Sequence, residues 1–121
     1  MAQRIVIHLT HAADNLTATA MALRLGATLQ AKGAQVTLLL DLEGARVVDT
    51  RQPLDLVTRR GKALSELYDQ FVQAGGTSLV CPHCAGAIGL SAETLRPGAA
   101  IAADDEALAQ LILDADKILD Y

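Results

Sequence analysis

Short apolar runs alternate with longer stretches of helical periodicity, and this alternation constrains the fold more than any other feature of the sequence. The run Arg4-Ile5-Val6-Ile7-His8-Leu9 is largely apolar at consecutive positions, which is typical of a strand covered on both faces. A helix is expected next, with Asp14 or Asn15 as its cap and Gly33 as its stop. The run 36–40 completes a strand–helix–strand unit, in which the two strands are expected to be parallel.

The rest of the chain continues the alternation. The further predicted elements are a helix over 63–72, a strand over 77–81, a short helix over 85–90, a strand over 99–103 and a helix over 105–114. Residues 41–62 show no sustained period and predict a long loop with one helical turn, which is typical of a segment that binds a ligand or a partner. Strands that alternate with helices in this way indicate an α/β fold, with helices on both sides of an open parallel sheet.

Length and composition fit a single domain over residues 1–121. Hydrophobic residues make up 51% of the chain but aromatic residues only 2%, so the core has to be built from Ala, Leu, Ile and Val. Such short side chains bury little area, and a domain of this size hides only about two-thirds of its unfolded surface. Self-association is therefore expected to add burial.

Charge and hydropathy argue against two classes of partner. The formal net charge is -4 and the longest basic run is Arg59-Arg60-Gly61-Lys62, so nucleic acid is not an expected partner. No apolar stretch approaches the roughly 20 residues that cross a bilayer, and the amino terminus lacks the layout of a signal peptide. We therefore expect a cytoplasmic protein with no membrane partner.

Polar side chains gather where two predicted strands end, which is where ligands bind in open α/β sheets. The cluster after the strand over 4–9 consists of Thr10, His11, Asp14 and Asn15. The cluster at the end of the strand over 77–81 consists of Cys81, Pro82, His83 and Cys84. If the two strands are neighbours, both clusters share one crevice. His8 lies inside the first strand and is expected to point into the packing of the sheet.

The pair Cys81 and Cys84 is the strongest chemical signal in the sequence. In a reducing compartment, two cysteines separated by two residues indicate a redox or metal pair rather than a structural disulfide. At a strand end that leads into a helix, the helix amides favour the thiolate of Cys81. The competing interpretation is that both cysteines are small buried hydrophobic residues.

A metal site and a disulfide-exchange site would use the same two cysteines. CxxC is half of a zinc site, and His11 with His83 or His8 is a candidate for the other half. Thiol–disulfide exchange needs the two thiols alone. No glycine-rich turn follows the first strand, so a nucleotide cofactor is not expected.

The segment Ser78-Leu79-Val80-Cys81-Pro82-His83-Cys84-Ala85-Gly86-Ala87-Ile88-Gly89-Leu90 and the order of the elements resemble the DsrE/DsrF-like (YchN-like) family of sulfur-relay proteins. The close of the chain, from Ala115 to Tyr121, is similar to the terminal strand of that family. The resemblance covers most of the chain. It implies a three-layer sandwich, in which about five mainly parallel strands are covered by helices on both faces.

The resemblance also implies a function. Relay members carry a persulfide on a cysteine at the end of the fourth strand, a place that Cys81 occupies, and pass the sulfur between donor and acceptor proteins or small sulfane-sulfur species. Cys84 is then a resolving thiol or a second acceptor, and His11, His83 and Asn15 are expected near the substrate. Such a sulfurtransferase-type carrier needs no cofactor, and zinc belongs to the metal interpretation alone. Family members assemble as homotrimers or homohexamers.

Overall fold

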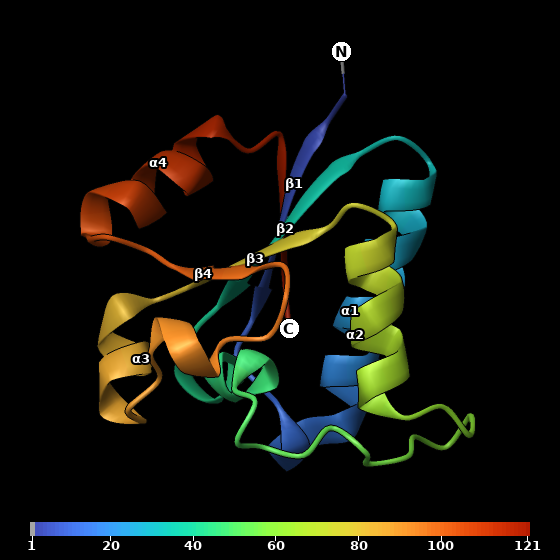
Figure 1. Cartoon of the computed structure of the whole chain (residues 1–121). Coiled ribbons are helices and arrows are strands. Elements are labelled where there is room, and N and C mark those ends of the chain that lie inside the picture. The colour runs from blue at the N-terminus through green and yellow to red at the C-terminus, as the bar shows by residue number, and fades with distance from the viewer. Residues whose placement is uncertain (1) are drawn as a thin grey trace.

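In the computed structural model, which describes residues 2–121, a five-stranded parallel sheet forms the centre of the protein (Figure 1). The strands are β1 (Arg4–Leu9), β2 (Gln35–Leu40), β3 (Thr77–Val80), β4 (Ala99–Ile101) and β5 (Lys117–Asp120). Their order across the sheet is β4-β3-β2-β1-β5, and every neighbouring pair is parallel. The strand that the family resemblance implied at the end of the chain is present, and it pairs with β1.

Helices cover both faces of this sheet. The α-helices are α1 (Leu16–Ala31), α2 (Leu64–Gln73), α3 (Pro82–Ala87) and α4 (Asp105–Asp114), and the 3-10 helices are η1 (Ala13–Asn15), η2 (Leu42–Val48) and η3 (Ala92–Thr94). α1 and α2 lie side by side on one face, and α4 lies on the other (Figure 1). The expected α/β sandwich is therefore confirmed. Across residues 2–121, no helix has the length and apolar character needed to cross a membrane.

The alternation of side chains along each strand gives the sheet two different faces. In β1, Ile5, Ile7 and Leu9 belong to the main core, whereas Val6 and His8 face the side that α4 covers. β2 alternates in the same way. Both faces of each central strand are covered, which explains why these strands are apolar at consecutive positions.

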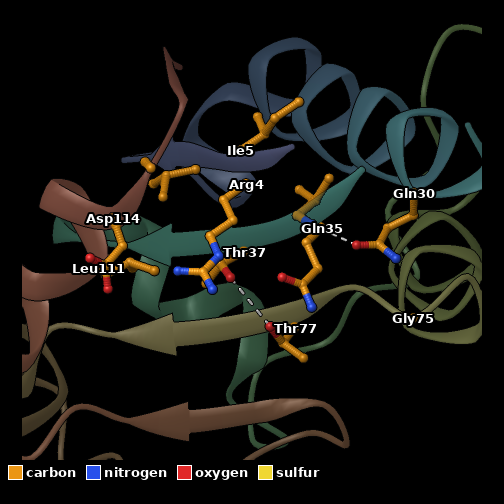
Figure 2. A pocket seen from close by; sticks show the side chains of 12 residues that line it. Arg4, Ile5, Gln30, Gln35, Thr37, Gly75, Thr77, Leu111 and Asp114 are labelled. Carbon is orange, nitrogen blue, oxygen red and sulfur yellow. Dashed lines mark hydrogen bonds between the residues drawn. The ribbon is translucent and has the colours of Figure 1, made fainter. Parts of the chain in front are cut away.

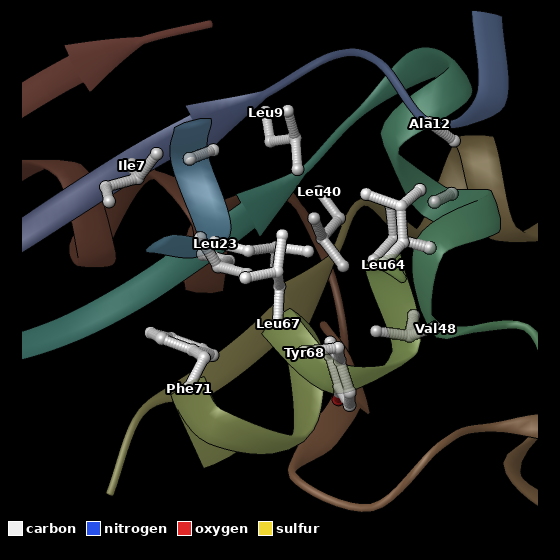
Figure 3. Packing of buried hydrophobic residues seen from close by; sticks show 14 of the residues in the cluster. Ile7, Leu9, Ala12, Leu23, Leu40, Val48, Leu64, Leu67, Tyr68 and Phe71 are labelled. Atoms are coloured by element: carbon white, nitrogen blue, oxygen red, sulfur yellow. The ribbon is translucent and has the colours of Figure 1, made fainter. Parts of the chain in front are cut away.

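The main core lies between the sheet and the layer formed by α1 and α2 (Figure 3). Tyr68 and Phe71 of α2 are its largest fully buried side chains, and aliphatic residues fill most of the remaining volume. The hydroxyl group of Tyr68 donates a hydrogen bond of 2.6 Å to the carbonyl oxygen of Pro97, which satisfies that polar group. Gly26 lets α1 approach α2 closely, because a Cβ atom there would lie 2.9 Å from the ring of Phe71.

Local signals explain where α1 begins and ends. The side chain of Asn15 caps the helix, because its Oδ1 accepts a hydrogen bond of 3.0 Å from the amide of Ala18. Gly33 follows the helix with a φ of 98°, a left-handed conformation that glycine adopts at little cost. Both residues were expected in these roles from the sequence.

Several boundaries differ from the sequence prediction. α3 begins at Pro82 and not at residue 85, because proline suits the first position of a helix, where its missing amide hydrogen is not needed. β4 ends at Ile101 and not at residue 103. The segment 41–62 begins with η2, whose buried residues Ala45, Val47 and Val48 extend the core, and continues as an irregular loop.

Candidate functional site

Cys81 lies immediately after β3, at the carboxyl edge of the sheet. Its amide donates a hydrogen bond of 3.0 Å to the carbonyl oxygen of Leu40, and its own carbonyl oxygen accepts one of 2.9 Å from Ala85. These bonds fix the residue between β2 and α3. The family resemblance implied that Cys81 follows the fourth strand of the chain. Cys81 does follow a strand, but β3 is the third strand. Cys81 is the N-cap residue of α3, and its side chain makes no capping hydrogen bond to the helix.

Cys84 contacts the residue that follows the neighbouring strand. Its Sγ atom donates a hydrogen bond of 3.0 Å to Oδ1 of Asp41, which comes directly after β2. The amide of Leu42 donates to Cys84 Sγ at 3.1 Å and to Asp41 Oδ1 at 3.0 Å. Because β2 and β3 are paired neighbours, the residues that follow them lie side by side. One carboxylate and two thiols therefore meet at this point.

The contact changes the acidity of both partners. The hydrogen bond from Cys84 is the largest of the effects that lower the pKa of Asp41, and bonds from His8 and from the amide of Leu42 act in the same direction. Burial, followed by the neighbouring carboxylate, raises the pKa of Cys84 to about 12. At neutral pH, Asp41 is therefore ionised and Cys84 keeps the proton that it donates.

His8 joins this cluster from the middle of β1. Its Nε2 lies 3.2 Å from Oδ2 of Asp41, and its Nδ1 lies 3.0 Å from Oδ1 of Asp120 in β5. Both ring nitrogens can donate at once when the imidazole carries its second proton. The expectation that His8 points into the packing of the sheet is corrected, because its side chain is 30% exposed and faces the side of α4. A continuous chain of contacts thus runs from Asp120 through His8 and Asp41 to Cys84.

A cavity of about 300 Å³ opens beside the cluster. Its polar wall consists of His8, Asp41, Cys81 and Asp120. Its apolar wall comes from both the sheet and α4, and consists of Val6, Leu39, Leu108, Ile112 and Ile118. The Cys81 side chain is half-buried and unpaired by disulfide, so it is a free thiol in contact with space that a small molecule can enter.

Within residues 2–121, a single group of three or more candidate metal ligands is present: Asp41, Cys81 and Cys84, with ligand atoms within 4.8 Å of one another. None of the histidines that the sequence suggested as further ligands, His8, His11 and His83, is part of it. The third candidate ligand beside the two cysteines is therefore Asp41 and not a histidine.

The cluster after β1 lies apart from the cysteines, because β2 separates β1 from β3. His11 pairs with Asp14, with 2.8 Å between Nδ1 and Oδ2, and Asn15 is engaged in capping α1. His83 is 76% exposed and its Nε2 lies 3.3 Å from Oδ1 of Asp105. The structure therefore does not bring His11, His83 and Asn15 together around the two thiols.

A second cavity, of about 320 Å³, lies at the opposite edge of the sheet, where the strands begin (Figure 2). Arg4 and Gln35, the first residues of β1 and β2, line it together with Gln30. The Gln30 side chain already bonds the backbone, accepting from Val36 at 2.6 Å and donating to Ala74 at 3.0 Å. This cavity holds no thiol.

The sequence profile of the DsrE/DsrF-like family matches residues 3–121. The chain belongs to the DsrE/DsrF-like family. Membership supports a role of the sulfur-relay type in general. No curated protein matches the chain.

Two solved structures resemble this DsrE-like chain over its length. YchN from E. coli has a TM-score of 0.79 and 19% sequence identity, and the match covers 100% of both chains. MTH1491 from Methanobacterium thermoautotrophicum, a protein of unknown function, has a TM-score of 0.74 and 12% identity, and the match covers 98% of this chain and 99% of that one. At such identities the likeness establishes the fold alone.

Sequence reasoning missed Asp41 as part of the site of this DsrE-like protein. A signal was present, because Asp41 directly follows the predicted strand over 36–40 and strand ends were the expected place for ligands. What the sequence did not supply was the order of the strands. Asp41 reaches Cys84 because β2, and not β1, is the neighbour of β3.

Proposed function

We propose that this DsrE-like protein carries sulfane sulfur as a persulfide on Cys81 and passes it to an acceptor thiol. The observation that supports this most is the free Cys81 thiol at the wall of the 300 Å³ cavity, with a second thiol in the same cluster. The general sulfur-relay role of the family points to the same chemistry. The donor and acceptor are small sulfane-sulfur compounds or partner proteins.

Loading needs no cofactor in this proposal. The Cys81 thiolate attacks the outer sulfur atom of a donor such as thiosulfate, so that a new sulfur–sulfur bond forms on Cys81 while the bond in the donor breaks and sulfite leaves. In transfer, an acceptor thiolate attacks the same outer sulfur and Cys81 leaves as a thiolate. Both steps exchange one sulfur–sulfur bond for another, and no external electrons are needed.

Cys84 is the resolving thiol in this proposal. Its sulfur can attack the inner sulfur of a Cys81 persulfide, which forms a Cys81–Cys84 disulfide and releases hydrogen sulfide. In the free protein, Cys84 keeps its proton in the hydrogen bond to Asp41. The persulfide is therefore expected to persist long enough to reach an acceptor, and a dithiol reductant would reset any disulfide that forms.

Intact-mass spectrometry after incubation with thiosulfate or polysulfide tests the proposal. The chain contains two cysteines, so Cys81→Ser and Cys84→Ser each leave a single thiol. We expect the mass of one added sulfur atom in the wild type, no adduct in Cys81→Ser, and a longer-lived adduct in Cys84→Ser. A reversible Cys81–Cys84 disulfide without sulfur uptake would contradict the proposal and favour thiol–disulfide exchange.

A further inference from the structure

The same edge of the sheet brings two sulfur atoms and one carboxylate oxygen together from two segments of the chain. Leu40 of β2 is paired with Val80 of β3, so the next residue of each strand, Asp41 and Cys81, share the carboxyl edge. Cys84 follows within α3 and returns its Sγ atom to the same side, where it contacts Asp41. The three ligand atoms lie within 4.8 Å of one another.

The donor types identify the class of ion. Two cysteine sulfurs with one carboxylate oxygen suit Zn²⁺, which binds sulfur, nitrogen and oxygen ligands in tetrahedral geometry. Mg²⁺ and Ca²⁺ take oxygen ligands instead, so a site with two sulfurs discriminates against both. Atoms bound tetrahedrally to one zinc ion at about 2.0–2.3 Å lie roughly 3.3–3.8 Å apart, and the three atoms here lie within 4.8 Å of one another, with 3.0 Å between Cys84 Sγ and Asp41 Oδ1. Small side-chain adjustments therefore suffice to close this cluster around an ion.

We propose that Cys81, Cys84 and Asp41 form a zinc site, with a fourth position that opens into the 300 Å³ cavity. Three protein ligands with one open position are typical of zinc sites that exchange a ligand, whereas purely structural sites are closed by four. Cys81 and Asp41 both line that cavity, so water or a small anionic or thiol ligand can reach the open position.

The groups around the three ligands support this assignment. The oxygen of Asp41 that does not face Cys84 accepts from His8 at 3.2 Å, and His8 is in turn held by Asp120. Hydrogen bonds of this kind orient a carboxylate ligand and are a usual part of metal sites. The amide of Leu42 donates to Cys84 Sγ, which favours a charged sulfur. Zinc would take the place of the proton that Cys84 shares with Asp41, and that proton would be released.

Zinc and sulfane sulfur would then compete for Cys81, and this consequence rests on the proposed function. A Cys81 sulfur bound to zinc has its nucleophilic electron pair engaged by the metal. Zinc occupancy would therefore block loading, and removal of zinc would restore it. The site would couple the sulfur-carrying state of the protein to the availability of a thiophilic metal.

Metal titration of the full chain tests the site directly. Purified protein is stripped with a chelator and titrated with Zn²⁺, with native mass spectrometry for stoichiometry and Co²⁺ as a spectroscopic substitute. We expect one ion per chain and thiolate-to-cobalt absorption. Asp41→Asn and Cys84→Ser should each weaken binding by at least about tenfold. Failure of the wild type to bind, or binding by Asp41→Asn as tight as that of the wild type, would overturn the site.

Two control variants test whether a loss of zinc binding comes from the loss of a ligand and not from the substitution of any carboxylate or histidine. Asp55→Asn makes the same carboxylate-to-amide change at an exposed position and should leave zinc affinity unchanged. His11→Ala removes a ligand suggested by the sequence but placed elsewhere by the structure, and it should also bind normally. Loss of binding in His11→Ala would contradict the ligand set. If Cys84→Ser does not fold, Asp41→Asn still decides the result, because it preserves the size of the side chain.

Loading with thiosulfate in the presence of zinc tests the competition. We expect at least a tenfold drop in sulfur adduct at saturating zinc and recovery after chelation. Sulfur uptake without any zinc binding would overturn the zinc site and leave the proposed function standing. Zinc binding without sulfur uptake by the metal-free protein would overturn the proposed function and leave the site. If zinc binds but does not reduce sulfur uptake, the proposed competition between zinc and sulfur for Cys81 is wrong.

Discussion

At the scale of single residues, Asp41 connects the functional groups of the site. One of its oxygens contacts Cys84 and the other contacts His8, so the carboxylate is held in place by partners on both sides. It is one-third exposed, and it lies on the wall of the cavity together with Cys81. The orientation of this carboxylate should therefore depend on His8, although His8 is not one of the three ligands.

We predict that His8→Ala lowers the zinc affinity of the protein by about tenfold to a hundredfold without abolishing binding. The physical reason is that partners of a metal ligand orient it and typically contribute this much to affinity. His8→Gln retains an N–H donor and should recover part of the loss. Calorimetric titration with Zn²⁺ measures both variants. Equal affinity in the wild type and His8→Ala would show that the amide of Leu42 orients Asp41 without help from His8.

The cysteines of the site could be predicted from the sequence, but their partners could not. Cys81 and Cys84 stand out because a CxxC pair at the end of a strand is typical of redox and metal sites. From the sequence, His8 is expected in the packing of the sheet because it lies in an apolar strand. The alternation of side chains along a strand that is covered on both faces does not say on which face a side chain stays partly exposed. Its role depends on Asp41 and Asp120, which are 33 and 112 residues away.

A second residue-scale feature is the buried carboxylate of Asp49, whose side chain is 1% exposed. Nε and Nη2 of Arg51 donate to its two oxygens, each at 2.9 Å, and the amide of Arg51 donates at 3.0 Å. These bonds, foremost the one from the Arg51 side chain, hold the pKa of Asp49 below its usual value of 3.8. The pair fixes the start of the loop that follows η2.

We predict that Asp49→Asn lowers the Tm at neutral pH by about 5 °C, because a buried, charge-assisted pair is lost. The folded pKa lies below the unfolded one, so the stabilising contribution is complete above the unfolded pKa and is lost as the pH falls through the folded pKa. The difference in Tm should therefore shrink below pH 3.8. Thermal melts across pH measure this, with Asp55→Asn as an exposed control. A Tm difference that stays constant with pH would rule out the ion pair as its source.

At the scale of elements, the position of η2 depends on how closely it approaches β1. A Cβ atom on Gly44 would overlap the carbonyl oxygen of Leu9, and backbone atoms do not move aside easily. η2 also begins at Leu42, whose amide contacts Asp41 and Cys84. The packing of η2 on the sheet thus fixes one wall of the candidate site.

We predict that Gly44→Ala destabilises the protein by about 1–3 kcal/mol through overpacking against Leu9. Because η2 carries Leu42, the same substitution should weaken zinc binding. Chemical denaturation measures the stability, and the matched control is Gly86→Ala in α3, where an added Cβ meets nothing within 4 Å. Gly86→Ala should be neutral or slightly stabilising, as expected for a helical glycine with free space. Equal stability of the two variants would contradict the close approach of η2 to β1.

Most elements could be predicted from the sequence because each carries its own periodicity and end signals, such as Asn15 and Gly33 around α1. Their neighbours in space were harder to predict. The expected sharing of one crevice by the two polar clusters depended on β1 and β3 being adjacent, and β2 lies between them. Strand order depends on contacts between residues far apart in the chain, which local patterns do not encode.

At the scale of the whole molecule, the two faces of the sheet are covered unequally. α1 and α2 bury the main core together, whereas every residue of α4, which covers the opposite face, is at least partly exposed. Apolar side chains remain open on that side, with Leu113 77% exposed and Ile112 and Ile118 more than 40%. Such an arrangement favours burial against another copy of the chain, as the composition and the family resemblance led us to expect.

We predict that the protein assembles as a homotrimer or homohexamer through the side of α4, and that Leu113→Lys raises the dissociation constant of the assembly by at least tenfold. Full burial of a leucine side chain is worth about 1.5–3 kcal/mol, and a lysine in its place adds the cost of burying a charge. Light scattering coupled to size exclusion, over a dilution series, measures the change.

Val57→Lys is the matched variant, because Val57 is 60% exposed in the long loop, the other segment that the sequence suggested as a contact. If Val57→Lys dissociates the assembly and Leu113→Lys does not, the contact between copies lies in that loop and not on α4. In that case the open side of α4 would remain free to admit a partner thiol or a sulfur donor to the cavity beneath it. If Leu113→Lys dissociates the assembly, the contact between copies includes α4, the helix that supplies Leu108 and Ile112 to the cavity that Cys81 lines.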